Sequence, residues 1–452
     1  MRKAFKLVAA LGMVATMAAP AMAASVDYSG FLRVKGYESN YFDSRTANFS
    51  PSKLNGAQTY TYVDQRWRGK FTVGDENVKA VTFLELNEKW GDTTTGGRIG
   101  TDGTDQLRAK NVYLWFKIPD TTVDFTVGLQ NVTDAYAGVF FGAMDVAGAF
   151  TTFKPVEALA FRLGAAVPYQ TTLASGSEQT NSQNTKLFIA EAKFAPAKDV
   201  KVGANLYFLR DGYTAWAPGG NAISTFANPG TTKLFVPGVD FAVNAGVATV
   251  SGFVFGQFGD RTYFSGAEKT KFGGYAADLR ADVNAGPAKV FAEALYTSGD
   301  KTSANKYEGL VVMDDYRFGS GSSTFNRTNM EIITSPPDAI GSGRTITYDQ
   351  NNQGRGEILL AAGASAEVAP KLTVKGNVGY LRANQFLAAE ENTGRGKNQA
   401  IELNATVSYN VTKGLDAGLT GAYVFAGDLY KPTGAQSPTD PYAVVARLNY
   451  AY

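Results

Sequence analysis

The sequence predicts an all-β protein, a transmembrane antiparallel β-barrel of 18 strands, with 16 strands as the alternative count. Three observations lead to this prediction. Long stretches alternate apolar and polar residues, the connections between them alternate between short and long, and the chain begins with an export signal. In such a barrel the short turns are expected on the periplasmic side and the long loops on the extracellular side.

The alternating stretches are long and have two faces. The last eleven residues, YAVVARLNYAY (Tyr442–Tyr452), place apolar side chains on one face and Arg447 and Asn449 on the other. The same period of two occurs in 275–283, 372–380 and 401–409. Alternation of this length indicates strands that cross a bilayer at a tilt. A large secreted β-sandwich or β-helix would share the alternation but not the regular order of turns and loops.

The connections supply the strand count. Short ones, rich in the Gly, Pro, Asn, Asp and Lys of tight turns, lie near Gly74–Asn77, Pro119–Thr121, Pro155–Glu157, Pro196–Asp199, Asn244–Gly246, Asn284–Pro287, Ala369–Lys371 and Thr412–Gly414. Longer polar stretches fall between them, at 38–57, 91–105, 131–149, 170–184, 211–232, 260–270, 299–354, 387–399 and 431–440. Eight turns and nine loops join 18 strands, and an even number puts both barrel ends at the periplasmic rim.

The N-terminus has the three parts of a secretory signal peptide. Arg2, Lys3 and Lys6 precede an apolar run, which ends near the small-residue site Ala21-Met22-Ala23. We expect a signal peptide at 1–23 and a barrel at 24–452. The apolar run is too short for a spanning helix, and the rest of the chain contains no uninterrupted apolar run of about 18 residues.

Composition excludes several functions. The 43 Lys and Arg nearly balance the 41 Asp and Glu, whereas a nucleic-acid-binding protein would need a basic surplus. The chain has no Cys and no His, so it cannot form disulfides, thiolate metal sites, His-ligated haem or zinc, or a Ser-His catalytic group. We therefore expect no enzyme activity, no cofactor and no metal. A plugged siderophore receptor is also disfavoured, because the first strand pattern already starts at Val26.

Two stretches carry a family resemblance. QLRAKNVYLWFKIPDTTVDFTVGLQNV (Gln106–Val132) resembles the hairpin before the constriction loop of the large substrate-specific porins, and DQRWRGKFTV (Asp64–Val73) resembles their basic second strand. The terminal aromatic strand resembles the assembly signal of Gram-negative outer-membrane porins. The aromatic richness is similar to that of the major outer-membrane channel proteins of metal-reducing deltaproteobacteria. The resemblance implies an 18-stranded porin, and the family offers both monomers and trimers.

Charged side chains on the polar face are the candidate pore lining. With apolar residues directed at lipid, basic residues gather on the first two strands and the last one, which adjoin in a closed barrel. These predicted pore-lining basic residues are Arg33, Lys35, Arg66, Arg68, Lys70 and Arg447. The predicted acidic residues, with Arg280 among them, are Asp278, Asp282, Glu293, Glu357, Glu367 and Glu402. Such opposed walls would form a transverse field that favours anions, or the charges would only keep the interior wet, each neutralised by a neighbour.

Two loops and one local pattern leave alternatives open. The third long loop, 131–150, is the candidate constriction, with Asp134 and Asp145 facing the basic wall, or else it only caps the barrel. The long extracellular loop 299–354 is expected to be an exposed flap. Arg108 and Lys110 share the parity of apolar Val112, so either a bulge switches the face there or both lie above the membrane.

Three functional hypotheses remain. The first is a porin for passive diffusion of small hydrophilic solutes, with a preference for anions, in the outer membrane among lipid and lipopolysaccharide. Tyr450 and Tyr452 then form the signal read by the barrel-assembly machinery and sit at the periplasmic interface. The second is a sheath around a multihaem cytochrome partner. The third, an outer-membrane enzyme, is disfavoured by the missing histidine.

Overall fold

The computed structural model of the protein describes residues 25–41, 59–91, 98–99, 107–169, 184–212, 230–263, 269–301, 305–313, 325, 327–334, 345–347, 350–388, 390–431 and 439–452. The predicted signal peptide lies outside this set. Within it, no helix is long and apolar enough to cross a membrane.

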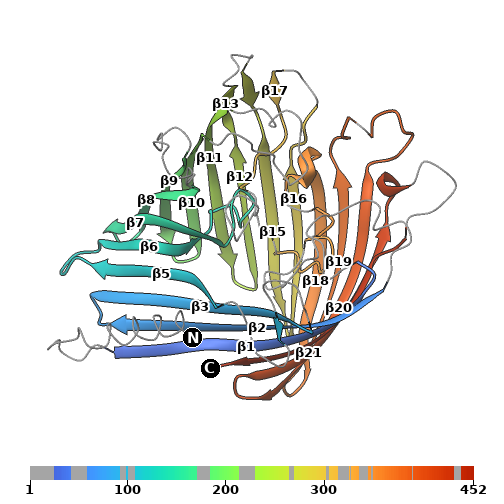
Figure 1. Ribbon diagram of the computed structural model, residues 1–452, viewed down its shortest axis with the longest axis horizontal. Coiled ribbons are helices and arrows are strands. Elements are labelled where there is room, and N and C mark those ends of the chain that lie inside the picture. The colour runs from blue at the N-terminus through green and yellow to red at the C-terminus, as the bar shows by residue number, and fades with distance from the viewer. Residues whose placement is uncertain are drawn as a thin grey trace.

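Antiparallel strands form one closed wall (Figure 1). The first half of the wall consists of β1 (Ser25–Ser39), β2 (Tyr60–Gly74), β3 (Val78–Trp90), β5 (Arg108–Lys117), β6 (Asp124–Val132), β7 (Met144–Val156), β8 (Leu159–Tyr169), β9 (Thr185–Ala197) and β10 (Val200–Asp211). The second half consists of β11 (Gly230–Ala245), β12 (Ala248–Gly256), β15 (Tyr275–Ala285), β16 (Ala288–Thr297), β18 (Glu357–Ala369), β19 (Leu372–Ala383), β20 (Asn398–Thr412), β21 (Leu415–Ala426) and β22 (Tyr442–Ala451). These strands confirm the predicted 18-stranded antiparallel barrel.

Shorter elements extend the wall at its loop end. They are β4 (Arg98–Ile99), β13 (Phe258–Tyr263), β14 (Thr270–Phe272), β17 (Lys306–Tyr307) and the 3-10 helices η5 (Asn352–Gly354) and η6 (Asp428–Tyr430). Strand β13 continues β12 beyond Gln257, and both pair with β11.

The first and last strands close the barrel. Phe31 faces Ala451 and Ser39 faces Ala443 in the register of β1 with β22. Gly30 and Tyr452 exchange two backbone hydrogen bonds of 3.0 Å, which complete this seam at its end. A sheet in hydrocarbon needs such closure, because an open edge would leave backbone groups unpaired.

All eight predicted turns join neighbouring strands. Glycine is required at positions such as Gly246 and Gly286, which have φ of 73° and 62°, a left-handed conformation that other residues rarely adopt. We call the end of the barrel with these short connections the turn rim and the opposite end the loop rim. The chemistry of tight turns is local, which explains why the sequence located these connections.

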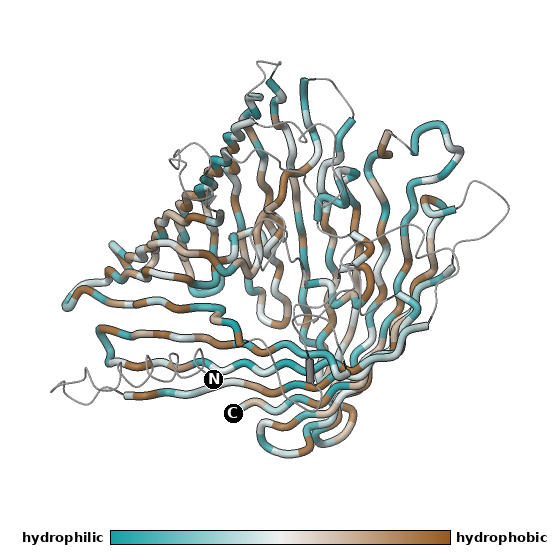
Figure 2. The backbone as a smooth tube through the Cα atoms, in the orientation of Figure 1, coloured by the Kyte–Doolittle hydropathy of each residue, from teal (hydrophilic) through white to brown (hydrophobic). Residues whose placement is uncertain are grey.

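The wall has an apolar outer face and a mixed inner face. Hydropathy alternates along the strands (Figure 2). On β1, the side chains of Arg33 and Lys35 are buried on the inner face. Their neighbour Leu32 lies on the outer face and is 38% exposed. Other exposed apolar residues occupy outward positions around the barrel, among them Leu114, Leu206, Leu279 and Leu403. This inversion of the arrangement in soluble proteins suits a wall surrounded by lipid.

Much of the loop-side interior is filled by the chain itself. One cluster of buried apolar residues joins inward side chains of the wall to loop residues 136–141 and 307–313. Within 299–354, residues 307–313 are packed against the inner wall, whereas Lys301 is exposed, so only part of this stretch departs from the exposed flap that the sequence predicted. The predicted loop 131–150 is also shorter, because β6 ends at Val132 and β7 begins at Met144.

Candidate functional site

The six predicted basic residues lie on the inner-face positions of three adjacent strands. Arg33 is opposite Arg66 in the register of β1 with β2, and Lys35 is opposite Arg447 in that of β1 with β22. On β2, the next inward residue after Arg66 in the direction of the turn rim is Arg68, which is opposite Phe31. Lys70 is the inward residue after that. Backbone pairing therefore gathers these cations into a ladder, here defined as Arg33, Lys35, Arg66, Arg68, Lys70 and Arg447.

Carboxylates are interleaved with this ladder. Arg68 Nε donates to Glu85 Oε2 at 2.6 Å, and Arg66 Nε lies 3.7 Å from the same oxygen. Arg447 pairs with Asp416 at 2.7 Å. Sequence reasoning missed Glu85 and Asp416 as partners, although their inward parity on β3 and β21 was a signal that could have found them. The ladder is thus less purely basic than the sequence suggested.

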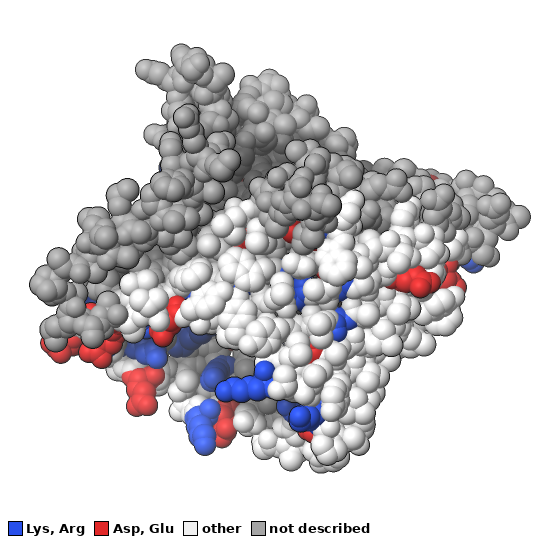
Figure 3. Space-filling view, turned by 60° about the horizontal axis from the view of Figure 1, so that its bottom comes forward, with Lys and Arg blue, Asp and Glu red and all other residues white. Residues whose placement is uncertain are grey.

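Three of the six predicted acidic residues form ion pairs with two arginines. On β15, Arg280 pairs with Asp282 at 2.7 Å and with Glu293 of β16 at 2.8 Å. Arg327, from the long loop, reaches Asp278 at 3.2 Å and Glu293 at 3.0 Å. Where the side chains are visible in Figure 3, basic and acidic groups lie beside one another. The arrangement gives local ion pairs rather than one acidic wall, and the sequence contained no local signal for the role of Arg327.

The remaining predicted acidic residues have separate positions. Glu357 is buried at the start of β18, on the loop side. Glu367, near the opposite end of β18, accepts the backbone N–H of Lys371 in the turn. Glu402 of β20 is buried and accepts the backbone N–H groups of Glu331, Ile332 and Ile333 at 2.6, 3.0 and 2.8 Å.

Residues 327–334 form a strap along the inner wall. One end is fixed on β15 and β16 by the ion pairs of Arg327, and the other by Glu402 on β20. Between these ends, Met330 approaches Gly379 of β19 so closely that a Cβ there would meet its sulfur. Burial raises the pKa of Glu331 to about 7, against the lowering effect of Lys35 and Arg447 of the ladder.

The loop 133–143 is organised around Asp134. Its Oδ1 accepts the backbone N–H groups of Tyr136 and Gly138, both at 2.8 Å, and its Oδ2 accepts those of Phe140 and Phe141 at 2.8 and 2.7 Å. Burial raises the pKa of Asp134 to about 7, although the four N–H groups act in the opposite direction. Asp134 therefore shapes its own loop instead of facing the ladder.

The same loop packs onto the wall through aromatic rings. The Tyr136 ring stacks on Phe255 of β12 at a centroid distance of 4.4 Å, and Phe141 meets Tyr207 of β10 edge-on at 5.2 Å. The Tyr207 hydroxyl accepts the Ala135 N–H at 2.7 Å and donates to Glu191 at 2.8 Å. These contacts hold the loop inside the barrel.

The inward loops also contact each other and the wall. The Met313 N–H donates to the Phe140 carbonyl at 3.0 Å. Gln257, at the junction of β12 and β13, donates to the Val311 carbonyl at 2.6 Å and accepts its N–H at 2.8 Å. The two loops therefore narrow the lumen together.

A bulge explains the parity conflict of β5. Asn111 pairs with Phe83 and Ala109 with Leu84, so Lys110 is an extra residue in β5 and the alternation shifts there. Lys110 pairs with Asp145 at 2.6 Å. Asp145 is thus a strand residue at the start of β7, not part of the loop that the sequence predicted.

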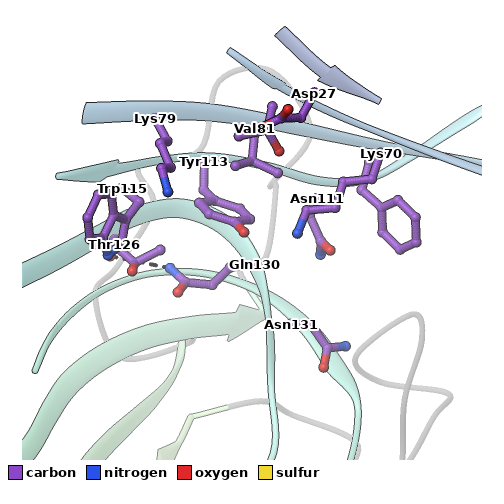
Figure 4. A pocket seen from close by; sticks show the side chains of 12 residues that line it. Asp27, Lys70, Lys79, Val81, Asn111, Tyr113, Trp115, Thr126, Gln130 and Asn131 are labelled. Atoms are coloured by element: carbon purple, nitrogen blue, oxygen red, sulfur yellow. Dashed lines mark hydrogen bonds between the residues drawn. The ribbon is translucent and has the colours of Figure 1, made fainter. Parts of the chain in front are cut away.

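Below these loops, toward the turn rim, described residues line a larger and a smaller cavity. The larger, of about 680 Å³, is lined by residues of β1, β2, β3, β5 and β6 (Figure 4). The smaller, of about 200 Å³, lies at β15 to β19 beneath the strap residue Asn329. Both have polar and apolar lining groups. Among the described residues, no group of three or more Asp and Glu could hold a metal ion.

The two terminal aromatics lie beside the seam. Tyr450 and Tyr452 are 45% and 38% exposed, with ring centroids 5.7 Å apart. The Tyr452 hydroxyl is 2.7 Å from the Tyr28 hydroxyl and accepts the Trp67 Nε1–H at 2.7 Å. The last residue therefore connects β22 to β1 and β2.

The chain matches no protein-family model and no curated protein. Solved structures do resemble it. OccK9 (OpdG) of Pseudomonas aeruginosa has 11% identity and a TM-score of 0.56 over 94% of this chain and 98% of its own. OpdL of the same organism has 11% identity and a TM-score of 0.55, over 94% and 99%.

A BenF-like porin from Pseudomonas fluorescens Pf-5 has 10% identity and a TM-score of 0.54, over 94% of this chain and 98% of its own. The fold is therefore that of the outer-membrane porins, as the terminal strand and the hairpin suggested. All three structures come from Pseudomonas, so the resemblance to deltaproteobacterial channel proteins stays a prediction.

Proposed function

We propose that the protein is a porin of the bacterial outer membrane, a passive channel for small hydrophilic solutes. The observation that carries this proposal is a closed barrel, apolar outside, whose interior is narrowed by its own loops while polar cavities remain. Lipid would surround the outer face, and water would enter from the turn rim. Narrowing by anchored loops gives a defined constriction through which solutes are selected.

The proposal includes a route to the membrane. The signal peptide at 1–23 would direct export, and the barrel-assembly machinery would insert the barrel among lipid and lipopolysaccharide. The ordered contacts of Tyr452 at the seam support a role for the terminal strand in closure. The ladder holds six cations, more than the carboxylates of Asp64, Glu85 and Asp416 that lie among them, and this supports a mild preference for anions.

Planar lipid bilayers test the channel. Purified full-length protein should insert in discrete steps of ion conductance, and liposomes that contain it should admit small neutral solutes. Its folding would be checked by heat-modifiable migration on a gel. A folded barrel that carries no current in bilayers and admits no solute would contradict the proposal.

The alternative is a sheath that holds a multihaem cytochrome. Such a partner would have to occupy the space now taken by loop residues such as Phe140, Phe141 and Met313, which are fully buried. Expelling them would expose apolar side chains and leave the bonds of Asp134 and Glu402 unmade. The channel is therefore the better supported function. Co-purification of a haem protein, seen by its absorbance, would favour the sheath.

A further inference from the structure

The larger cavity presents an unusual set of hydrogen-bonding groups. Three carboxamides line it, Asn111, Gln130 and Asn131. The NH₂ group of each is used within the protein. Asn111 Nδ2 donates to the Lys110 carbonyl and Asp145 at 2.8 and 2.9 Å, and Asn131 Nδ2 donates to Asp145 at 3.0 Å.

Gln130 completes this pattern. Its Nε2 donates to the carbonyls of Thr126, Gly128 and Gly148 at 3.3, 3.4 and 3.4 Å. None of the three amide oxygens accepts a hydrogen bond from a described residue. The cavity therefore offers three neutral acceptors, and a ligand that satisfies them must carry several donors.

Aromatic rings border the same space. Tyr113 occupies the middle of the lining in Figure 4, with Trp115 on one side and Asn111 on the other. Phe83 lies on the adjacent strand, opposite Asn111 in the register. Next to Tyr113 in the pairing of β5 with β6 is Gly128, which has no side chain to cover the ring. An apolar ring face is thus left half-exposed beside the polar groups of the cavity.

The lining holds charges of both signs, Lys70 and Lys79 against Asp27. Lys70 and Lys79 line the cavity, and the Lys79 ammonium is 5.1 Å from the Trp115 ring centroid. These two groups disfavour a cation. Asp27 and the three amide oxygens, which cannot donate, disfavour an anion. A neutral ligand with several hydroxyls satisfies both the amide oxygens and the lysines, since a hydroxyl can donate to an amide oxygen and accept from a lysine.

We propose that this cavity is a binding site for a neutral pyranose sugar. The hydroxyls meet Asn111, Gln130, Asn131 and the lysines, and the C–H face of the ring stacks on Tyr113 and Phe83. A volume of about 680 Å³ falls within the range of about 300–1,000 Å³ that ligand sites occupy. The proposal rests on the channel function, and places a sugar on the path of diffusion at the turn rim.

Calorimetry with purified folded protein tests the site, with D-glucose, maltose and benzoate as probes. Glucose or maltose should bind, and Tyr113→Ala should weaken that binding by about tenfold or more, since stacking on an aromatic face contributes energy of that order. Gln130→Leu, which removes an acceptor, should weaken it as well. Phe291→Ala is the matched control, because this ring lines the smaller cavity and should leave sugar affinity unchanged.

Each result has a definite meaning. Absence of sugar binding by the folded wild-type protein overturns the assignment, and so does benzoate binding that Tyr113→Ala removes while sugars do not bind. The assignment would also be overturned if Phe291→Ala lost as much sugar affinity as Tyr113→Ala. Bilayer conductance separates this test from that of the channel. Sugar binding without conductance would refute the channel alone, and conductance without sugar binding would refute the sugar site alone.

Discussion

Among single residues, Asp134 determines the shape of the loop 133–143, because its two oxygens accept four backbone N–H groups. The surrounding residues are apolar and bury it. Docking the loop in the lumen therefore depends on a carboxyl group with two oxygens that can accept, whereas an amide of the same size offers only one acceptor oxygen.

Asp134→Asn should release the loop. Its amide has one acceptor oxygen, and its NH₂ group would face the N–H groups of Phe140 and Phe141. Each buried donor left unsatisfied costs roughly 1–3 kcal/mol. We expect a higher and noisier single-channel conductance than in the wild type, with the barrel still heat-modifiable. Thr133→Ala, which removes only the hydroxyl that accepts the Ala143 N–H, is the milder control. An Asn variant with wild-type conductance would show that Asp134 does not hold the constriction.

The pH should affect the same loop. The pKa of Asp134 rises from 3.8 to about 7 when the loop is docked, so docking is strongest below the lower value and weakens as the pH rises toward the higher one. Glu331 on the strap shifts in the same direction, to about 7. Conductance measured in a pH series should therefore rise between about pH 4 and pH 7, then level off. Asp134→Asn should remove most of this rise, and conductance that falls over the series would contradict the sign.

At the scale of elements, the strands were predictable and the inward loops were not. Alternation and turn chemistry are local, so 275–283 and 401–409 appeared as strands in the sequence and appear as β15 and β20 in the structure. The position of the strap depends on contacts such as Arg327 with Glu293, 34 residues apart in sequence, and no local pattern encodes such a contact. The bulge at Lys110 left a signal, since it broke the parity of β5.

The ladder gives the first prediction at this scale. Arg66, Arg68 and Lys70 changed together to Gln should shift the reversal potential toward cations, mainly in dilute salt, since the Debye length falls to about 3 Å near 1 M. The triple variant should also lose thermal stability. Glu85, which is 7% exposed as a side chain, would keep its charge without Arg68, and removing one partner of a buried pair costs roughly 3–5 kcal/mol.

Lys70→Gln alone is the control for that experiment. No described residue forms an ion pair with Lys70, so this variant should change selectivity slightly and leave stability unchanged. The basic-ladder hypothesis would be wrong if the inserted triple variant kept the wild-type reversal potential at low salt.

The strap, residues 327–334, gives the second prediction at the scale of elements. Arg327→Gln removes the ion pairs to Asp278 and Glu293 and leaves buried Asp278 without its ion pair, while Glu293 keeps Arg280, so the strap should loosen at β15 and β16. Glu402→Gln should loosen the other end, since an amide has one oxygen for three N–H groups. Both variants should raise conductance. Because both ends hold one segment, the double variant should raise it by less than the two single effects added. Strict additivity would argue against a single strap.

For the whole molecule, closure depends on the last residue. Tyr452 exchanges backbone bonds with Gly30 and its hydroxyl contacts Tyr28 and Trp67, so it joins three strands at the turn rim. Deleting Tyr452 should leave unfolded protein in the periplasm, whereas Tyr452→Phe should assemble and lose only the two hydroxyl contacts. The measurement is the heat-modifiable fraction in outer-membrane extracts. A fully assembled deletion variant would remove the basis for a terminal assembly signal.

The orientation of the barrel is the last prediction, and the absence of cysteine makes it direct to test. If the long loops face outward, a cysteine at an exposed position of the loop rim must react with a membrane-impermeant thiol reagent on intact cells. Lys301 is such a position, with a side chain 65% exposed. Pro287, exposed in a tight turn at the other rim, must stay unlabelled until the cells are lysed. Ile333, a fully buried residue of the strap that is held to Glu402, should react slowly in either case, and faster in a Glu402→Gln background because the strap is loosened. Labelling of Pro287→Cys but not of Lys301→Cys on intact cells would show that the barrel is inserted the other way.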